Sequence, residues 1–280
     1  MKYAATTANG TKPGTAMNTV KAGKAKKKRG ESLVERHAAL LLAVTILLIW
    51  EGWVRYSGIS PFVLPSPLNI IRRIFTDFPL LMSHLSVTLL EVLSGYGLAI
   101  MLGIPTALLI FYSRACERAI FPLLMGIQTI PKVALAPLLV LYLGYGWAPK
   151  ITLAFLISFF PIVVATTVGL QSLDKGLVNL VRSMGASEAQ TFFKIRLPAA
   201  LPNIFGGLKV GMSLAVIGAI IGEYVAAERG LGWLQMMANS RFDTTLNFAT
   251  VVTIAGMGIT LFFILGQIEK RVVHQRELAK

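Results

Sequence analysis

Three ionisable residues, Glu91, Lys132 and Glu223, lie within long apolar stretches of this sequence. A charged side chain at the depth of a lipid bilayer is costly, so such residues usually face the interior of a helix bundle or a water-filled path. There they contact a transported solute or pair with one another. The chemistry that these residues favour is therefore solute transport or internal ion pairing.

The prolines around Lys132 favour a solute path. Lys132 follows Pro131 and precedes Pro137, so we expect a broken helix here. A broken helix exposes backbone groups that must face protein or a water-filled cavity. Lys132 would supply positive potential for an anionic solute, but a structural ion pair with Glu91 or Glu223 suits the sequence equally well. The candidate pathway residues are Glu91, Gln128, Thr129, Lys132 and Glu223.

The sequence carries no constellation typical of an enzyme. Cys116 is the single cysteine, and His37, His84 and His274 are too far apart for a metal-ligand spacing. The stretch 93–97, LSGYG, is superficially similar to the signature of ABC ATPases, but the chain has no Walker A motif. We therefore predict that this chain does not hydrolyse ATP.

A polar, basic segment, residues 179–198, separates two apolar stretches and follows consistent local rules. Gly185 permits a sharp turn. Ser187 and Gln190 form the pattern of a capping box, which predicts a short helix directly after the serine. We expect Pro198 to end that helix.

This short helix would have an apolar side made by Phe192, Phe193 and Ile195. A helix on a glycine hinge with a rigid exit could present an apolar knob to a partner protein and transmit a rigid-body movement. The alternative is an ordinary amphipathic connector between two membrane spans.

The composition is that of a membrane protein, with 55% hydrophobic residues, 14% charged residues and a mean hydropathy of +0.67. Soluble domains carry about 25% charged residues. The net charge of +14 could suggest nucleic acid, but half of it lies in residues 1–37. The run 21–29 in that tail has no aromatic residue to stack a base. We expect a disordered cytoplasmic tail that acts as a topology signal or contacts anionic lipid, and no nucleic-acid partner.

Apolar runs long enough to cross a bilayer predict an all-α, polytopic membrane protein with six transmembrane helices. The predicted spans are 38–56, 84–112, 119–143, 148–170, 203–225 and 247–268.

Between the first two spans, Ser66 suits an N-cap and Pro67 the first helical position. Ile70, Ile71, Ile74 and Phe75 share one helical face. This pattern predicts a short amphipathic helix that lies on the outer membrane surface.

The distribution of basic residues predicts the orientation. Six spans place the tail, residues 113–118, the 171–200 loop and the C-terminus on one side, with nine, two, four and four basic residues. The opposite side holds six: Arg55, Arg72, Arg73, Lys150, Arg229 and Arg241. Because cytoplasmic loops are enriched in Lys and Arg, both termini are predicted to be cytoplasmic.

The spacing Gly185-x9-Ile195-x-Leu197-Pro198 resembles the EAA loop of binding-protein-dependent ABC importer permeases. The resemblance extends over about 60–275, and stretches such as FVLPSP, FFPIVVATTVGL and GEYVAAERGLGWL look like the nitrate/sulfonate/taurine branch. The sequence differs at 179–181, where Asn-Leu-Val replaces Glu-Ala-Ala.

The resemblance implies a type I ABC importer permease-like fold, with a permease domain at 38–280 and a cytoplasmic coupling loop at 174–198. The ATPase-coupling residues carried over are Gly185, Ala186, Ser187, Glu188, Ala189, Gln190, Phe192, Ile195, Leu197 and Pro198.

The same resemblance implies a homodimer in the bacterial inner membrane that assembles with two cytoplasmic ABC ATPase subunits and an extracytoplasmic binding protein. ATP and Mg²⁺ would belong to the ATPase, and this chain would hold no cofactor and no metal. The expected solute is a sulfonate-, taurine- or nitrate-like anion. Alternatives are a pyrimidine, vitamin precursor or aromatic acid, an ATP-independent secondary transporter or channel, and an intramembrane enzyme.

Overall fold

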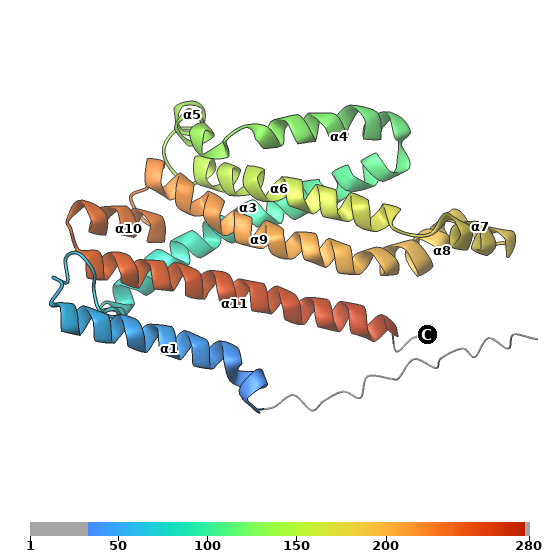
Figure 1. Cartoon of the computed structure of the whole chain (residues 1–280). Coiled ribbons are helices and arrows are strands. Elements are labelled where there is room, and N and C mark those ends of the chain that lie inside the picture. The colour runs from blue at the N-terminus through green and yellow to red at the C-terminus, as the bar shows by residue number, and fades with distance from the viewer. Residues whose placement is uncertain (1–32, 278–280) are drawn as a thin grey trace, which may run out of the picture. The chain divides into compact units, whose positions relative to one another are not determined.

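The computed structural model describes residues 33–277, which consist of helices and short connections (Figure 1). The chain divides into two units, one ending at Ile46 and one starting at Leu47. Helix α1, Leu33–Ser57, spans that boundary, so the last residues of the predicted 1–37 tail are helical. The rest of the tail lies outside the described residues.

The second unit contains the remaining helices. They are α2 (Pro67–Thr76), α3 (Phe78–Tyr112), α4 (Arg114–Thr129), η1 (Lys132–Leu135), α5 (Ala136–Leu143), α6 (Trp147–Gln171), α7 (Lys175–Ser183), α8 (Glu188–Thr191), η2 (Phe192–Arg196), α9 (Leu197–Ala226), α10 (Leu231–Ser240) and α11 (Thr244–Glu277).

Four helical segments of the described chain are long and apolar enough to cross a membrane: Phe78–Tyr112, Trp147–Gln171, Glu188–Ala226 and Thr244–Val273. A fifth span is possible if α4 and the η1–α5 segment are counted together. These two segments are separated by a short break and meet at a bend of 85°. The predicted break next to Lys132 is thus confirmed. Six spans stay a prediction, because the first, 38–56, lies partly in residues whose side chains are not described.

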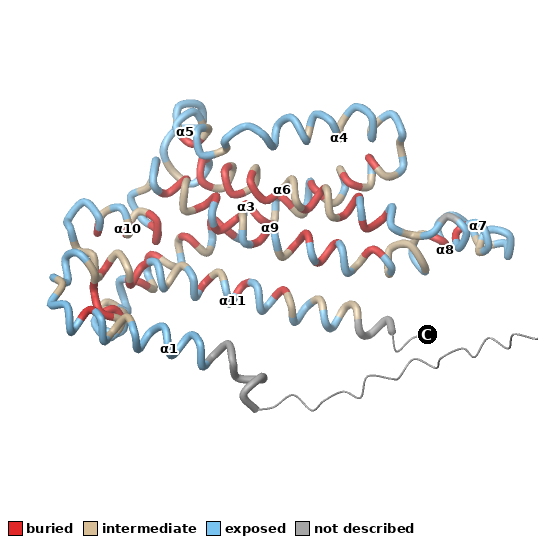
Figure 2. The backbone as a smooth tube through the Cα atoms, viewed as in Figure 1, coloured by how far each residue is buried: buried red, intermediate tan, exposed pale blue. Residues whose placement is uncertain are grey.

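Helices α3, α6 and α9 form the core of the second unit. Figure 2 shows the buried backbone concentrated where these three helices meet, whereas α4 is largely exposed. Glycines allow the close approach: a Cβ on Gly218 would lie 2.7 Å from Ala154 Cα, and one on Gly95 would lie 2.6 Å from Ala154 Cβ. Such glycines are typical of closely packed membrane helices. The core is therefore a tightly packed helix triplet.

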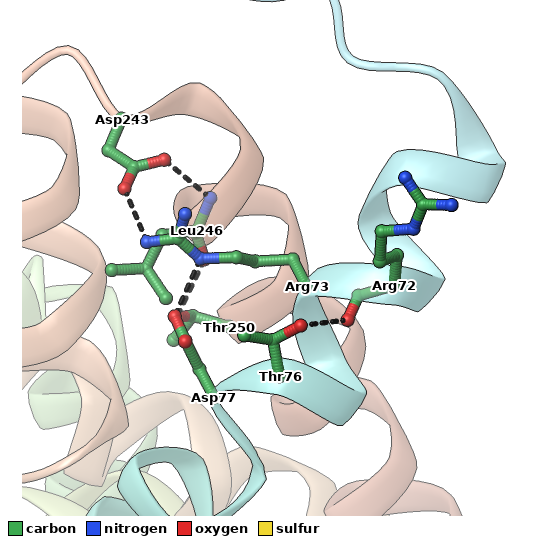
Figure 3. Close-up of polar contacts among 7 residues, drawn as sticks. All are labelled: Arg72, Arg73, Thr76, Asp77, Asp243, Leu246 and Thr250. Carbon is green, nitrogen blue, oxygen red and sulfur yellow. Dashed lines mark hydrogen bonds and ion pairs between the residues drawn. The ribbon is translucent and has the colours of Figure 1, made fainter.

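The predicted amphipathic helix after the first span is confirmed as α2. Ser66 caps it by accepting a hydrogen bond from the Asn69 N–H, at 3.4 Å. Arg73 then fixes its orientation: Nε lies 2.6 Å from Asp77 Oδ2, and Nη2 lies 2.8 Å from Asp243 Oδ2 (Figure 3). This arginine clamp attaches α2 to the start of α11, 170 residues away in the sequence.

Candidate functional site

The 179–198 segment forms a turn and a short helix at the end of α6 and α9 that lies opposite α10 (Figure 1). Gly185 adopts a φ of +84°, a conformation that other residues rarely take. The predicted capping box is present: the Gln190 N–H donates to Ser187 Oγ at 3.2 Å, and the Ser187 N–H donates to Gln190 Oε1 at 2.9 Å. An ion pair of Arg182 with Glu188 joins α7 to α8.

The prediction that Pro198 ends this helix is wrong. The chain continues as one helical segment from Glu188 to Ala226. A π-helical turn, Phe192–Arg196, precedes the proline, and the Leu197 N–H bonds the Phe192 carbonyl. Pro198 therefore falls in the first turn of α9, where its missing N–H costs little. The loop helix and α9 therefore form one continuous helical segment.

The predicted coupling residues divide into an exposed turn and a half-buried base. Phe192 packs against Tyr112 with the two rings tilted and their centroids 5.8 Å apart, and the Arg196 guanidinium lies 5.1 Å from the centroid of the Phe111 ring. Phe193, by contrast, is 64% exposed. The exposed or partly exposed turn residues are Gly185, Ala186, Ser187, Glu188, Ala189 and Gln190, and the half-buried ones are Phe192, Ile195, Leu197 and Pro198. The loop is thus anchored on α3 while its tip stays accessible.

A second group of polar residues is buried at the opposite end of the core. Glu91 of α3 forms an ion pair with Lys150 of α6, and their side chains are 0% and 6% exposed. Lys150, which the sequence predicts on the outer side, lies buried in the first turn of α6. The Lys150 ammonium also lies 5.6 Å from the Trp147 ring centroid.

Glu223 of α9 lies beside this pair and binds the start of α10. Its carboxylate accepts hydrogen bonds from Thr88 Oγ1, at 2.6 Å, and from the Gly232 N–H. The Leu231 N–H donates to Thr88 Oγ1 at 2.8 Å. Side chains from α3 and α9 thereby satisfy the free N–H groups at the N-terminus of α10.

His84 completes this attachment from the first turns of α3. Its Nδ1 accepts a hydrogen bond from the Gly230 N–H at 3.0 Å, and its ring stacks on Trp233 at 5.4 Å. Both positions require glycine. Gly230 has a φ of +120°, which other residues rarely adopt, and a Cβ on Gly232 would lie only 2.9 Å from Glu223 Oε2. We call Glu91, Lys150, Glu223, Thr88 and His84 the buried polar cluster.

The other predicted pathway residues lie apart from this cluster, on the bent α4–α5 segment. Lys132 Nζ donates to the Gln128 carbonyl at 3.1 Å, and Thr129 Oγ1 donates to the Gly126 carbonyl at 2.7 Å. The proposed ion pair of Lys132 with Glu91 or Glu223 is wrong, because Lys150 occupies that position. A pathway role for these residues stays a prediction.

An open cavity of about 530 Å³ borders the buried polar cluster. Its walls include Trp147, Lys150 and Arg229. Lys150 is the cluster residue that lines it, and the α9–α10 connection forms another part of its wall. The described residues contain no group of three or more His, Cys, Asp or Glu side chains that could hold a metal ion.

Sequence reasoning found two members of the cluster, Glu91 and Glu223, and missed Lys150, Thr88 and His84. One signal was available: two acids in separate apolar stretches need a cation, and Lys150 stands at the start of a third stretch. The hydrogen bonds from the α10 backbone had no sequence signal.

Comparisons with known proteins agree with this architecture. Residues 99–276 match the family described as binding-protein-dependent transport system inner membrane component. The chain is 37% identical to the formylaminopyrimidine transport permease protein ThiX of Halalkalibacterium halodurans, over 85% of this chain and 95% of that protein. It is also 37% identical to the riboflavin transport system permease protein RibX of Chloroflexus aurantiacus, over 84% and 90%.

A putative aliphatic sulfonates transport permease protein, SsuC of Bacillus subtilis, is 30% identical over 83% of this chain and 85% of that protein. Among solved structures, a chain of the inward-facing MetNI methionine ABC transporter superposes with a TM-score of 0.59 at 19% identity. The match covers 72% of this chain and 98% of that one. This structural similarity supports the fold alone.

Proposed function

Because this chain belongs to the family of binding-protein-dependent transport system inner membrane components, and is therefore an ABC importer permease, we propose that its 174–198 loop couples it to a separate ATPase. The domain that carries this function is 38–280. The observation that carries the proposal is the geometry of the loop. A capped, exposed tip continues without interruption into the core helix α9.

The contacts of the loop explain how a movement of the ATPase would reach the core. Phe192 and Arg196 hold the base of the loop against the end of α3. Helix α9 packs closely on α6 through its glycines, so a displacement of α8 has to move the core helices together. ATP and Mg²⁺ belong to the partner ATPase. This chain supplies the helical segment that transmits the movement from the loop to the core.

We further propose that the permease acts as a homodimer with two ATPase subunits and a binding protein. Support for a second copy comes from the bent α4–α5 segment, on which large apolar side chains such as Leu123, Val133 and Leu141 are exposed. None of the residues of α4 is buried. Gln128, Thr129 and Lys132 lie on this segment, so a second copy packed there would place them along a shared pathway.

Two solute classes remain as proposals. A small sulfonate-, taurine- or nitrate-like anion is favoured by Lys132 on the bent segment and by the sulfonate permease relative. A pyrimidine or vitamin precursor is favoured by the similarity to ThiX and RibX, each 37% identical to this chain. Competition assays with the purified importer in liposomes, using taurine, nitrate, a formylaminopyrimidine and riboflavin, separate the two classes.

The assembly is tested by purifying tagged full-length chain from its native membrane. We expect an ABC ATPase to copurify in stoichiometric amount and to be lost when the loop tip 186–190 is replaced by glycine and serine. A chain that purifies alone and transports solute in liposomes without ATP would overturn the proposal in favour of a secondary transporter.

A further inference from the structure

A groove of about 470 Å³ runs between the last turns of α1, helix α2 and α11. Its walls are almost entirely apolar and include Leu47, Leu48, Ile70, Ile71, Ile74 and Val252. All of these residues lie in the second unit of the chain. The groove is therefore shaped for a hydrocarbon chain.

One end of this groove is polar and carries a cation. Glu51 Oε1 accepts a hydrogen bond from Arg55 Nε at 2.6 Å, and Glu51 Oε2 accepts one from the Leu68 N–H at 2.9 Å. Both carboxylate oxygens are thus in use. The Arg55 side chain is 65% exposed, and its two terminal nitrogens donate to none of the described residues. This end of the groove offers guanidinium donors to an anion.

Helix α2 is held so that its apolar side remains open. The Arg73 clamp, shown in Figure 3, fixes the helix, and Ile70 packs inward. Leu68, Ile71 and Phe75, on the neighbouring face, are exposed. A short helix with one charged face and one open apolar face lies in the plane of a membrane interface.

On the α1 side, the groove is also apolar at one end and has interfacial side chains at the other. Trp53 and Tyr56, near the end of α1, are exposed, as expected for aromatic side chains at a membrane interface. Leu47 and Arg55 are eight residues apart, or about 12 Å along the helix. Half of a bilayer's hydrocarbon core is about 15 Å thick. An acyl chain beside Leu47 would therefore bring its phosphate close to Arg55.

We propose that this groove binds one phospholipid of the outer leaflet, with an acyl chain between α1 and α2 and the phosphate bound by Arg55. The assignment to the outer leaflet rests on the proposed importer function and on the cytoplasmic termini that the distribution of basic residues predicts. The phospholipid would fill the gap between the first helix and the surface helix, and so support the position of α2.

The test uses the complete importer, delipidated in detergent and examined by native mass spectrometry during titration with phosphatidylglycerol or phosphatidylethanolamine. Diacylglycerol, which lacks the phosphate, is the control lipid. We expect one tightly bound phospholipid per permease chain and much weaker binding of diacylglycerol. Equal binding of the two lipids would overturn the assignment to Arg55.

Matched variants locate the site. Arg55→Gln should weaken phospholipid binding by about fivefold, the value of one arginine near a membrane surface, and Arg55→Lys should restore most of it. Arg72 is the control because it is exposed on α2 outside the groove and points away from the clamp (Figure 3). If Arg72→Gln weakens binding as much as Arg55→Gln, the lipid is held by general surface charge and the proposal fails.

Ile71→Trp fills the groove without changing charge and should abolish the tight binding. A photoreactive amino acid introduced at position 48 should crosslink to phospholipid. Crosslinks from this position to a second copy of the chain instead would assign the groove to an interface and overturn the proposal. Copurification of the ATPase is measured for every variant, and should be unchanged, so that failure of the lipid site is distinguished from failure of the importer assignment.

Discussion

Lys150 in α6 and Glu91 in α3 form an ion pair that is almost completely removed from solvent. The Glu91 carboxylate also lies beside the carboxyl group of Glu223 in α9. The ion pair therefore joins α6 to α3, and the two neighbouring carboxyl groups lie where α3 meets α9. Removing a partner from a buried pair leaves an uncompensated charge, which costs far more than the pair itself contributes.

Lys150→Met should accordingly destabilise the protein by about 3–5 kcal/mol, because two acids would then face each other without a cation. The double variant Glu91→Gln, Lys150→Met should recover much of that loss. The measurement is the thermal unfolding of the purified importer, arranged as a double-mutant cycle. Lys132→Met is the control, since Lys132 donates to the Gln128 carbonyl just before the break and forms no ion pair within the described residues. Additive effects of the two single variants would show that the pair is not coupled.

The attachment of α10 depends on two glycines, and one of them gives a clean test. Gly232→Ala places a Cβ 2.9 Å from both Glu223 Oε2 and the Ile220 carbonyl. We expect a loss of about 1–3 kcal/mol, the usual cost of overpacking a filled site. Gly256→Ala is the matched control, because a Cβ there meets nothing within 4 Å and alanine favours a helix. Both variants are compared by thermal unfolding, and equal stabilities would contradict the packing described for α10.

The features that could be predicted from the sequence are local, and those that could not be predicted depend on contacts between distant residues. The capping box of Ser187 and Gln190, the N-cap Ser66 and the break near Lys132 were predictable because each depends on residues within one or two turns. The partner of Glu91 was not predictable, because the helix packing selects Lys150 over Lys132.

Pro198 shows how a correct local rule can fail. A proline normally ends a helix because its ring blocks a hydrogen bond to the preceding turn. Here the π-helical turn shifts the hydrogen-bond register by one residue, so that the proline occupies an early position where no donor is required. The sequence contains no simple signal for that shift.

The turn at Gly185 predicts a specific ranking of substitutions. A Cβ at this position meets nothing within 4 Å, so the cost comes from the backbone conformation, with its φ of +84°. Gly185→Asn should be tolerated, since asparagine adopts positive φ more readily than most residues. Gly185→Val should strain the turn by about 1–2 kcal/mol and reduce ATP-driven uptake while the protein still inserts. Transport and ATPase association at wild-type levels in Gly185→Val would count against a coupling role for the loop.

Lys132 tests the electrostatic part of the pathway proposal. Lys132→Ala should slow uptake of an anionic solute by about tenfold or more if the ammonium attracts the solute in a poorly solvated path, which corresponds to about 1.4 kcal/mol. Lys132→Arg should retain most of the uptake because the charge remains. Uptake is measured in liposomes with the binding protein present. Undiminished uptake in Lys132→Ala would remove this residue from the solute path.

Phe192 and Phe193 are adjacent, but one is packed against the core and the other is exposed. Substituting each in turn separates attachment of the loop to α3 from contact of the loop with the ATPase. Phe192 packs against Tyr112, whereas Phe193 is largely exposed beside the loop tip. Phe193→Ala should weaken ATPase binding and leave thermal stability unchanged, because it removes exposed apolar surface available to a partner. Phe192→Ala should lower stability by about 3 kcal/mol or less, since the site is only half buried. Both variants are measured by pull-down with the ATPase and by thermal unfolding. A Phe193→Ala variant that lost stability and still bound the ATPase would contradict these separate roles.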